Sequence, residues 1–174
     1  LESGQNNLCS STIGSNNTVT VHVNELPVIS GTTSICKDST ILLTADSLGN
    51  ISNPWVSSNP SKATVTSGGL VAALDSGTVD IYFTDKHNCR DTITIRITAP
   101  PNAGTRAGSD SGCVGSSATL SSNGDGGGTW LSSNTSVATI NSSTGAGTGG
   151  ARGTTTSRYI GTGIGGCANE TATH

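Results

Sequence analysis

Short apolar runs, each bounded by Gly, Asn, Asp or Pro, recur along most of the chain. In the first half they are "STILLTA", "KATVT", "GLVAAL", "TVDIYF" and "DTITIRI". The last run alternates strictly between isoleucines and polar residues, with Ile93, Ile95 and Ile97 set against Thr92, Thr94 and Arg96. Because successive side chains of a strand point to opposite faces, this pattern predicts a strand with one buried and one wet face. The punctuation of the other runs predicts short strands joined by turns, without a long helix.

The pattern occurs twice. "WVSSNPSKATV", starting at Trp55, is matched by "WLSSNTSVATI", starting at Trp130, at a spacing of about 75 residues. Tyr82 and Tyr159 follow at a similar spacing. We therefore predict two copies of one unit, at residues 25–99 and 100–174, joined where Pro100 and Pro101 remove backbone donors and stop a strand. Residues 1–24 are predicted to be the terminal strand of a preceding copy, or a donor strand.

Each copy has about seven short strands around one tryptophan, which predicts an all-β fold of two-layer antiparallel sandwiches. The repeated positions of the aromatic residues within apolar patterns place them in the predicted cores: Trp55, Trp130, Tyr82 and Tyr159. A tryptophan platform for sugar stacking is the weaker interpretation.

Composition agrees with this class and excludes several functions. The 174 residues are 11% charged and 3% aromatic, with 24 Gly, and Ser, Thr, Gly and Asn dominate the polar residues, which disfavours long helices. A net charge of −3 without a basic cluster argues against nucleic acid or anionic lipid as a partner. No run approaches the 18 apolar residues of a membrane span. The starting residues, "LESG", include neither an initiator Met nor the apolar core of a signal peptide. We therefore expect a mature, soluble fragment.

The segment "WVSSNPSKATVTSGGLVAALDSGTVDIYF" resembles the bacterial immunoglobulin-like repeat of the invasin and intimin type. The cysteine-containing segments "TTSICKDSTILLTA" and "NCRDTITI" further resemble repeats of very large surface adhesins exported by type IX secretion. The resemblance implies tandem antiparallel immunoglobulin-like sandwiches in an extracellular stalk or adhesin, with no catalytic residue to carry over.

The cysteines are too far apart for a zinc or redox motif, since each copy holds two at a spacing of about 50 residues. We predict one disulfide within each copy, Cys36–Cys89 and Cys113–Cys167, and hence an oxidising compartment. Cys9 is the odd cysteine, unpaired or intermolecular, and aligns with the tail of a preceding copy.

The second copy departs from the first in two places. Three core-type residues of the first copy are replaced by small ones, with Leu70, Val71 and Leu74 becoming Ala146, Gly147 and Gly150. Compensation by neighbours, cover by another chain, and weak residue assignment in the Gly-rich stretch 145–150 are the alternatives. The second copy also stops where the first continues into its alternating strand, which predicts that its last strand is missing.

A missing strand and an extra one suggest strand exchange between subunits. The extra strand would be "TVTVHV", formed by Thr18, Val19, Thr20, Val21, His22 and Val23. The competing hypothesis, which we favour, is a window cut from a longer tandem array. Both predict a fibre of head-to-tail copies.

Motifs for catalysis or metal binding are weak. The G-x-G-x-x-G matches at 145–150 and 161–166 do not open a helix after a strand, so turns explain them. His22, His87 and His174 have no companion at a metal-ligand spacing, and Asp75, Asp80 and Asp85 form no calcium loop. We therefore predict no enzyme and no cofactor, with Ca²⁺ at the aspartates as a weakly supported alternative.

Glycosylation is the more plausible chemistry. Five sites fit N-x-[ST], at Asn16, Asn50, Asn134, Asn141 and Asn169, and such triplets arise readily in this composition. Three further sites resemble the D-[ST]-hydrophobic signal of bacteria with type IX secretion, at Ser39, Ser47 and Thr92.

The function predicted from these patterns is a non-enzymatic, extracellular structural protein: a segment of an adhesin stalk or surface filament, joined to copies of itself or neighbouring repeats. The first alternative is a module that binds surface glycans, mineral or ice through loops or a threonine row, although Thr92, Thr94 and Arg96 give only a short row. A donor-strand-exchanged polymer subunit and an accessory domain of a secreted enzyme are the others.

Overall fold

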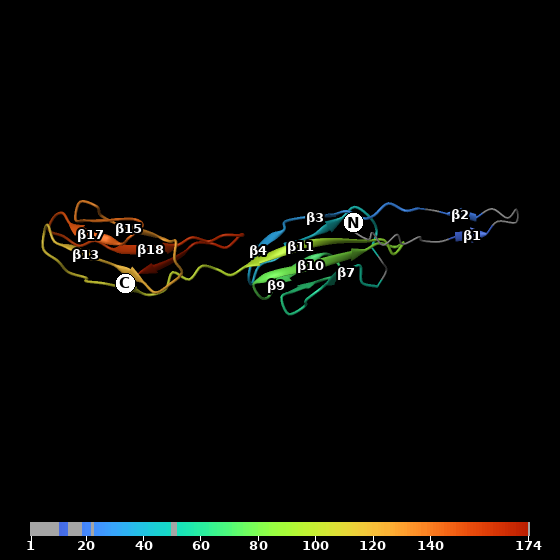
Figure 1. Ribbon diagram of the computed structural model, residues 1–174, viewed down its shortest axis with the longest axis horizontal. Helices are drawn as coiled ribbons and strands as arrows, with labels where there is room; N and C mark the ends of the chain where they lie inside the picture. Colours follow the sequence, from blue (N-terminus) through green and yellow to red (C-terminus); the bar gives the residue numbers. More distant parts are fainter. Residues whose placement is uncertain (1–10, 14–18, 22, 50–51, 174) are drawn as a thin grey trace, which may run out of the picture. The chain divides into compact units, whose positions relative to one another are not determined.

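The computed structural model describes residues 11–13, 19–21, 23–49 and 52–173 (Figure 1). All the regular structure in these residues is β-strand, so the predicted all-β fold is confirmed. No helix among them is long and apolar enough to cross a membrane. The chain divides into two compact units, Leu1–Thr98 and Ala99–His174. Each is described by itself.

The N-terminal segment forms a small sheet of its own. β1 (Ser11–Ile13) and β2 (Val19–Val21) pair antiparallel, with Ser11 opposite Val21. Val19–Val21 of the predicted donor strand therefore pair within their own chain, and the prediction that they lack a sheet is wrong. Val23 is exposed, and Thr18 and His22 lie outside the described residues, as does Cys9.

The first layer of unit 1 is a four-stranded sheet in the order β4-β11-β10-β7. Its strands are β4 (Ser34–Cys36), β7 (Trp55–Ser57), β10 (Gly77–Thr84) and β11 (Arg90–Thr98). β10 and β11 form a long antiparallel hairpin, and β7 pairs antiparallel with β10. β4 runs parallel to β11, with Cys36 opposite Thr98, which is an exception to the predicted antiparallel arrangement.

The second layer of unit 1 is a three-stranded antiparallel sheet in the order β5-β9-β8, accompanied by a two-stranded one, β3-β6. Its strands are β3 (Ile29–Ser30), β5 (Thr40–Leu42), β6 (Thr44–Ala45), β8 (Ala63–Val65) and β9 (Leu70–Ala73). Every apolar run predicted to be a strand is one.

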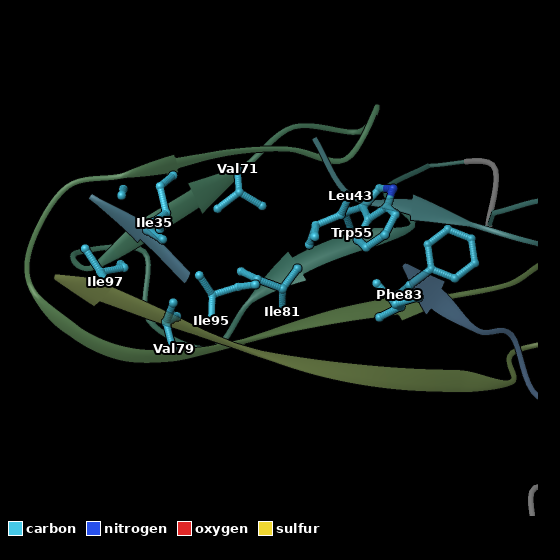
Figure 2. Close-up of a cluster of buried hydrophobic side chains, with 12 residues drawn as sticks. Ile35, Leu43, Trp55, Val71, Val79, Ile81, Phe83, Ile95 and Ile97 are labelled. Carbon is cyan, nitrogen blue, oxygen red and sulfur yellow. The ribbon is translucent and has the colours of Figure 1, made fainter. Parts of the chain in front are cut away.

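The core of unit 1 lies between these two layers (Figure 2). Alternate residues of the long hairpin supply five of its twelve members: Val79, Ile81, Phe83, Ile95 and Ile97. Ile35 of β4 and Trp55 of β7 add to the same layer, and Leu43 and Val71 pack against them from the second layer. The alternation of β11 is as predicted, because Ile95 and Ile97 are buried while Thr92, Thr94 and Arg96 are exposed.

Tyr82 is not a core residue, so that prediction is wrong. Its side chain is half-buried, and the Arg90 guanidinium lies 3.6 Å from its ring centroid. Phe83 takes the core position and packs against Trp55 with ring centroids 4.8 Å apart. Trp55 is opposite Phe83 as Trp130 is opposite Tyr159, so Tyr159 corresponds to Phe83 and not to Tyr82.

Unit 2 repeats most of this topology, but among its described residues no strand corresponds to β4, and its hairpin strands are shorter. β15 (Thr129–Ser132), β18 (Ser157–Gly161) and β19 (Glu170–Thr173) form one sheet. β13 (Ser117–Thr119), β17 (Ala146–Gly149) and β16 (Ala138–Ile140) form the other. β12 (Arg106–Ala107) and β14 (Ser121–Ser122) correspond to β3 and β6.

The last strand of unit 2 is present in short form, so the predicted absence is wrong. β19 pairs antiparallel with β18 over four residue pairs, from Gly161 opposite Glu170 to Arg158 opposite Thr173. It occupies the place that β11 takes beside β10. The sequence of β19, "ETAT", lacks the alternating isoleucines, and this is why the pattern did not identify it.

Of the three core side chains predicted to be lost in unit 2, only one corresponds to a buried residue of unit 1. Leu70 and Leu74 are 43% and 45% exposed, so their replacement removes nothing from the core. Val71 is fully buried, and it stands opposite Ile41 and Val65 as Gly147 stands opposite Ala118 and Ile140. The buried core of unit 2 is correspondingly small, and consists of Ala103, Leu120, Trp130, Tyr159 and Ala172.

Candidate functional site in the repeated framework and its ends

A glycine lies against the tryptophan ring in both units. The Gly69 carbonyl accepts a hydrogen bond of 2.9 Å from Leu43 N, and Gly145 accepts one of 2.9 Å from Leu120 N. Both glycines have positive φ, at 83° and 72°. A Cβ on Gly69 would overlap the Leu43 carbonyl oxygen and lie 3.2 Å from the Trp55 ring. Only glycine fits at this position without strain.

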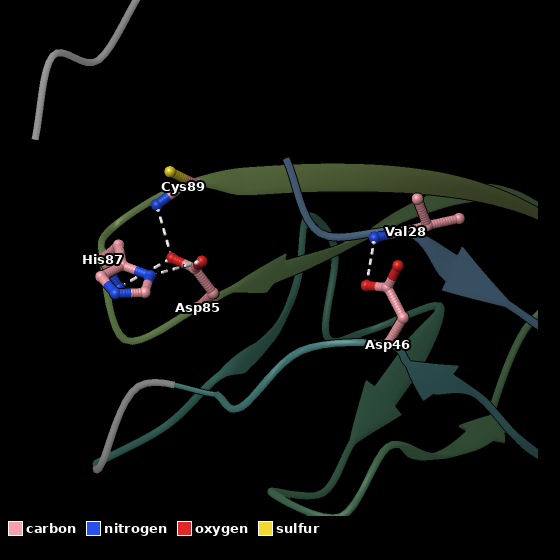
Figure 3. Close-up of polar contacts among 5 residues, drawn as sticks. All are labelled: Val28, Asp46, Asp85, His87 and Cys89. Atoms are coloured by element: carbon pink, nitrogen blue, oxygen red, sulfur yellow. Dashed lines mark hydrogen bonds and ion pairs between the residues drawn. The ribbon is translucent and has the colours of Figure 1, made fainter. Parts of the chain in front are cut away.

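Two short polar side chains fix turns at matching places in the two units. Asp46 Oδ1 accepts a 2.8 Å bond from Val28 N, as Figure 3 shows, and Asn123 Oδ1 accepts one of 2.7 Å from Thr105 N. These side-chain acceptors satisfy backbone donors that the short β3-β6 and β12-β14 pairs leave open.

The "SSN" motif that follows each tryptophan is a turn motif. Asn59 Oδ1 accepts from Ser61 N, and Asn134 Oδ1 accepts from Ser136 N, each at 3.1 Å. The backbone carbonyls of both asparagines accept a further bond from two alanine amides, Ala63 N and Ala138 N, at 3.1 Å. The residues that the two copies share therefore serve their own fold.

A buried carboxylate organises the hairpin between β10 and β11 (Figure 3). Asp85 is 3% exposed, and its Oδ1 accepts bonds of 2.8 Å from both His87 N and Cys89 N. Its Oδ2 lies 3.4 Å from His87 Nδ1. Asn88, at φ 64°, closes the turn.

The three aspartates named for Ca²⁺ each have their own partner. Asp85 holds the hairpin, Asp80 accepts a 2.6 Å bond from the Thr94 hydroxyl, and Asp75 pairs with Lys37 at 3.7 Å. Among the described residues, no group of three His, Cys, Asp or Glu could hold a metal ion.

An acidic residue at the start of the last strand fixes the incoming chain in each unit. Asp91 Oδ2 accepts a 2.9 Å bond from Ile29 N, and Glu170 Oε2 accepts one of 2.8 Å from Ala103 N. The chain therefore enters each unit beside its hairpin. We call this the hairpin end of a unit and the opposite end its far end.

Cys36 and Cys89 lie at opposite ends of unit 1, so the predicted Cys36–Cys89 disulfide is wrong. Cys36 is opposite Thr98 at the far end. Cys89 precedes Arg90, the first residue of β11, at the hairpin end. Nine residues of extended chain separate Cys89 from Thr98, a span of about 30 Å. A disulfide requires Cα atoms within about 7 Å.

The predicted Cys113–Cys167 disulfide is wrong for the same reason. Cys113 is an exposed free thiol, and its neighbour Gly115 N donates to Gly149 O at the end of β17. Cys167 lies in the hairpin after β18, where its N donates to Ile164 O at 3.1 Å. Cys36 and Cys167 are each disulfide-bonded, and neither can reach the other cysteine of its own unit.

The remaining predicted sites are scattered. Ser39 and Thr92 are exposed, whereas Ser47 Oγ is buried. The side-chain oxygens of Asn141 and Asn169 accept backbone bonds in turns, at 3.1 Å from Ser143 N and 2.8 Å from Gly163 N. Asn16, Asn50 and His174 lie outside the described residues.

Trp55 and Trp130 are each 4% exposed, so neither ring can stack on a sugar. Sequence reasoning missed three structural residues: Phe83, Gly69 and Glu170. Only Phe83 had a signal, because it continues the alternation of Val79 and Ile81.

Comparison with known proteins agrees with this architecture. The model of the family "Bacterial Ig-like domain (group 2)" matches residues 18–95. A C-terminal 282-residue fragment of intimin, solved in complex with the intimin-binding domain of the translocated intimin receptor, is similar in fold, with a TM-score of 0.51 and 16% identity. The similarity covers 84% of this chain and 63% of the intimin fragment.

The S-layer protein SbsC is a more distant match, with a TM-score of 0.40, 18% identity, and coverage of 91% of this chain and 29% of that one. No curated protein matches the chain. The residues that the family model matches lie within the first unit, and over them this chain is similar to the bacterial immunoglobulin-like domains of group 2.

Proposed function

We propose that this chain is a structural segment of an extracellular stalk or surface filament, in which sandwiches in series hold a binding partner away from the cell. The family is a non-enzymatic type of domain. The observation that carries the proposal is that one enclosed sandwich is built twice with the same internal framework. Tryptophan, glycine and turn asparagine recur at matching places: Trp55 and Trp130, Gly69 and Gly145, Asn59 and Asn134.

The outer faces of the two hairpins differ at a matching position. Tyr82, on the outer face of β10, corresponds to Arg158 in β18, by the register that aligns Phe83 with Tyr159. A repeated ligand-binding surface would require shared exposed residues, whereas a repeated spacer requires only a shared core. The pattern therefore favours a spacer.

The linker suits this role. Only residues 99–102 separate β11 from Ala103, and two of them are Pro100 and Pro101. Consecutive prolines fix φ and favour an extended, semi-rigid segment. Sandwiches joined in this way resist bending more than they would with a Gly/Ser linker.

Electron microscopy of the native material, at near-neutral pH and before any reducing agent is added, tests the proposal. Long beaded fibres with a two-domain repeat, labelled at the cell surface by antibodies against this segment, are the expected result. Discrete particles, or labelling only after the cells are broken, would overturn the proposal.

A second candidate, glycan binding, rests on the outer face of the β10-β11 hairpin. There Arg90 stacks on Tyr82, and Thr92 and Thr94 are exposed. On a glycan array the chain would then bind a defined set of sugars, and Tyr82→Ala would abolish binding while Thr64→Ala, exposed in β8 of the other layer, would not. An array without a hit would exclude this candidate.

A further inference from the structure

The turn that follows β14 in unit 2 carries an asparagine where the matching turn of unit 1, after β6, carries an aspartate. Asp46 N donates a 3.3 Å bond to Val28 O, and Asp46 Oδ1 accepts one of 2.8 Å from Val28 N. In unit 2, Asn123 N donates a 3.3 Å bond to Thr105 O, and Asn123 Oδ1 accepts one of 2.7 Å from Thr105 N. The same reciprocal pair of bonds is therefore made by a carboxylate in unit 1 and by a carboxamide in unit 2.

The residue that follows makes the carboxamide chemically labile. Asp46 precedes Ser47, whereas Asn123 precedes Gly124 and forms with it the one Asn-Gly dipeptide of the sequence. Because glycine has no Cβ, its backbone nitrogen is less shielded and its conformation less restricted than in other residues. An Asn-Gly peptide bond is therefore the most favourable place for the side-chain amide to be lost through attack by the following backbone nitrogen.

This reaction needs water and no oxidant. The Gly124 nitrogen loses its proton and attacks Cγ of Asn123, the side-chain nitrogen leaves as ammonia, and a cyclic succinimide forms. Water then adds to one of the two ring carbonyls and breaks the bond from that carbonyl to the Gly124 nitrogen. Opening at the side-chain carbonyl gives aspartate. Opening at the main-chain carbonyl gives isoaspartate, in which the chain continues through Cγ.

The native turn engages both groups that must react. Gly124 N donates a 3.2 Å bond to Ser122 Oγ. Asn123 Oδ1 accepts a 3.1 Å bond from the Thr105 hydroxyl besides the one from Thr105 N. Ring closure must bring Cγ within bonding distance of the Gly124 nitrogen, and this displaces Oδ1 from Thr105. Because two hydrogen bonds must be broken first, ring closure in the folded unit should be slower than in an unfolded chain by roughly tenfold or more.

The backbone of the turn also lies closely against the chain that enters unit 2. A Cβ on Gly124 would overlap the Asn102 carbonyl oxygen, and a Cβ on Gly104 would overlap the Gly124 nitrogen. Isoaspartate adds one carbon to the backbone at position 123 and would push Gly124 into this contact. Aspartate leaves the backbone unchanged, and Asp46 makes the same bonds with a carboxylate. The closed turn is therefore compatible with aspartate and not with isoaspartate.

We propose that Asn123 is a deamidation site that the fold of unit 2 keeps closed, so that it reacts when the turn after β14 opens. Conversion to aspartate lets the turn close again with one more negative charge, whereas conversion to isoaspartate prevents it from closing. The matching turn of unit 1 already carries the aspartate, at Asp46, and has no such reaction. The chemical state of position 123 therefore records past opening of unit 2.

Peptide mapping of the full chain after incubation at mildly alkaline pH, in buffer and in concentrated urea, tests the site. An endoprotease that cleaves before aspartate releases 110–124, in which Asn123 is the only asparagine. The aspartate product is also cut before position 123 and yields 110–122, whereas isoaspartate resists cleavage and leaves 110–124 with the mass of the acid. A sample digested without incubation gives the background.

We expect Asn123 to convert in urea, and to convert in buffer more slowly by roughly tenfold or more, because the two bonds to Thr105 are kept there. Equal rates in buffer and in urea, or no conversion in urea, would overturn the proposal.

Two variants test whether the turn accepts the carboxylate. At neutral pH, Asn123→Asp keeps an acceptor for Thr105 N and should unfold at a urea concentration no lower than the unaltered chain. Asn123→Ala removes the acceptor and should unfold at a lower concentration. An equal loss of stability in both variants would show that the turn does not tolerate the product.

The fate of the two products can be read from one refolded sample, because aspartate and isoaspartate peptides separate by chromatography. Slow hydrogen exchange at residue 123 should return in chains with aspartate and stay absent in chains with isoaspartate. Return of slow exchange in both would contradict the argument from backbone packing. None of these measurements depends on the proposed stalk function.

Discussion

Replacement of Gly69 by alanine tests whether the glycine beside the tryptophan ring is required by geometry. Gly69 has a φ of 83°, and its Cβ would overlap the Leu43 carbonyl oxygen and lie 3.2 Å from the Trp55 ring. Leu43 also donates a 2.9 Å bond to the Gly69 carbonyl, so the backbone cannot move without loosening this contact.

The expected loss of stability has a backbone part and a contact part. Holding an alanine in the left-handed region costs about 1–2 kcal/mol. Displacing the Leu43 backbone weakens a buried hydrogen bond worth about 1 kcal/mol and shifts the tryptophan from its packed position. We therefore expect Gly69→Ala to lower the free energy of unfolding of unit 1 by about 3 kcal/mol, a large share of the stability of a domain of this size.

The chain provides two matched controls. Gly68, the adjacent residue, has open space around its Cβ direction and no positive φ, so Gly68→Ala should be neutral or slightly stabilising. Gly115 has a φ of 83° with nothing within 4 Å of its Cβ, so Gly115→Ala isolates the backbone contribution of about 1–2 kcal/mol, in unit 2.

The assay is urea unfolding followed by tryptophan fluorescence. The fluorescence signal contains a contribution from each unit, through Trp55 and Trp130. Hydrogen exchange of peptides from each unit would show which unit unfolds in each transition. If Gly69→Ala and Gly68→Ala unfold at the same urea concentration, the argument from steric overlap is refuted.

Four further substitutions separate core, turn and strand positions by the same urea assay. Phe83→Ala should cost unit 1 about 3–5 kcal/mol and Tyr82→Ala less than about 1 kcal/mol, and equal losses would contradict the assigned faces of β10. Asp85→Ala should lower the free energy of unfolding of unit 1 by about 2–3 kcal/mol, because it leaves two backbone donors of the hairpin without their acceptor. Hydrogen exchange should become faster in that hairpin alone, and unchanged exchange there would contradict this role. Gly147→Ala should stabilise unit 2 by about 0.5 kcal/mol, since its Cβ would lie no closer than 3.4 Å to its neighbours, and a loss of stability would show that β17 needs the glycine.

The strands were predictable because local signals define them. In β11 the alternation of isoleucine with threonine and arginine gave both the strand and its buried face. Tyr82 shows where such reasoning fails. Matching it to Tyr159 by residue identity shifted the register by one position, and a shift of one residue exchanges the two faces of a strand. The alternation of Val79, Ile81 and Phe83 carried the correct answer.

The failure of the predicted Cys36–Cys89 disulfide could not be foreseen from spacing, because it depends on the direction of one strand. β4 runs parallel to β11, so Cys36, its last residue, lies where β11 ends. An antiparallel β4 would have ended beside the start of β11, close to Cys89, and the predicted pair would have been within reach. Spacing in sequence does not distinguish the two directions, whereas the register of the folded sheet does.

The small core of unit 2 predicts that it is the less stable of the two units. Among the described residues, the buried cluster of unit 1 has twelve members and that of unit 2 has five, two of them alanines. A core of that size rarely stabilises a domain under about 80 residues by more than about 3–5 kcal/mol. Unit 2 should therefore unfold before unit 1. Hydrogen exchange should accelerate throughout β15, β18 and β19 at a urea concentration that leaves the β10-β11 hairpin protected, and equal protection of both would contradict this reasoning.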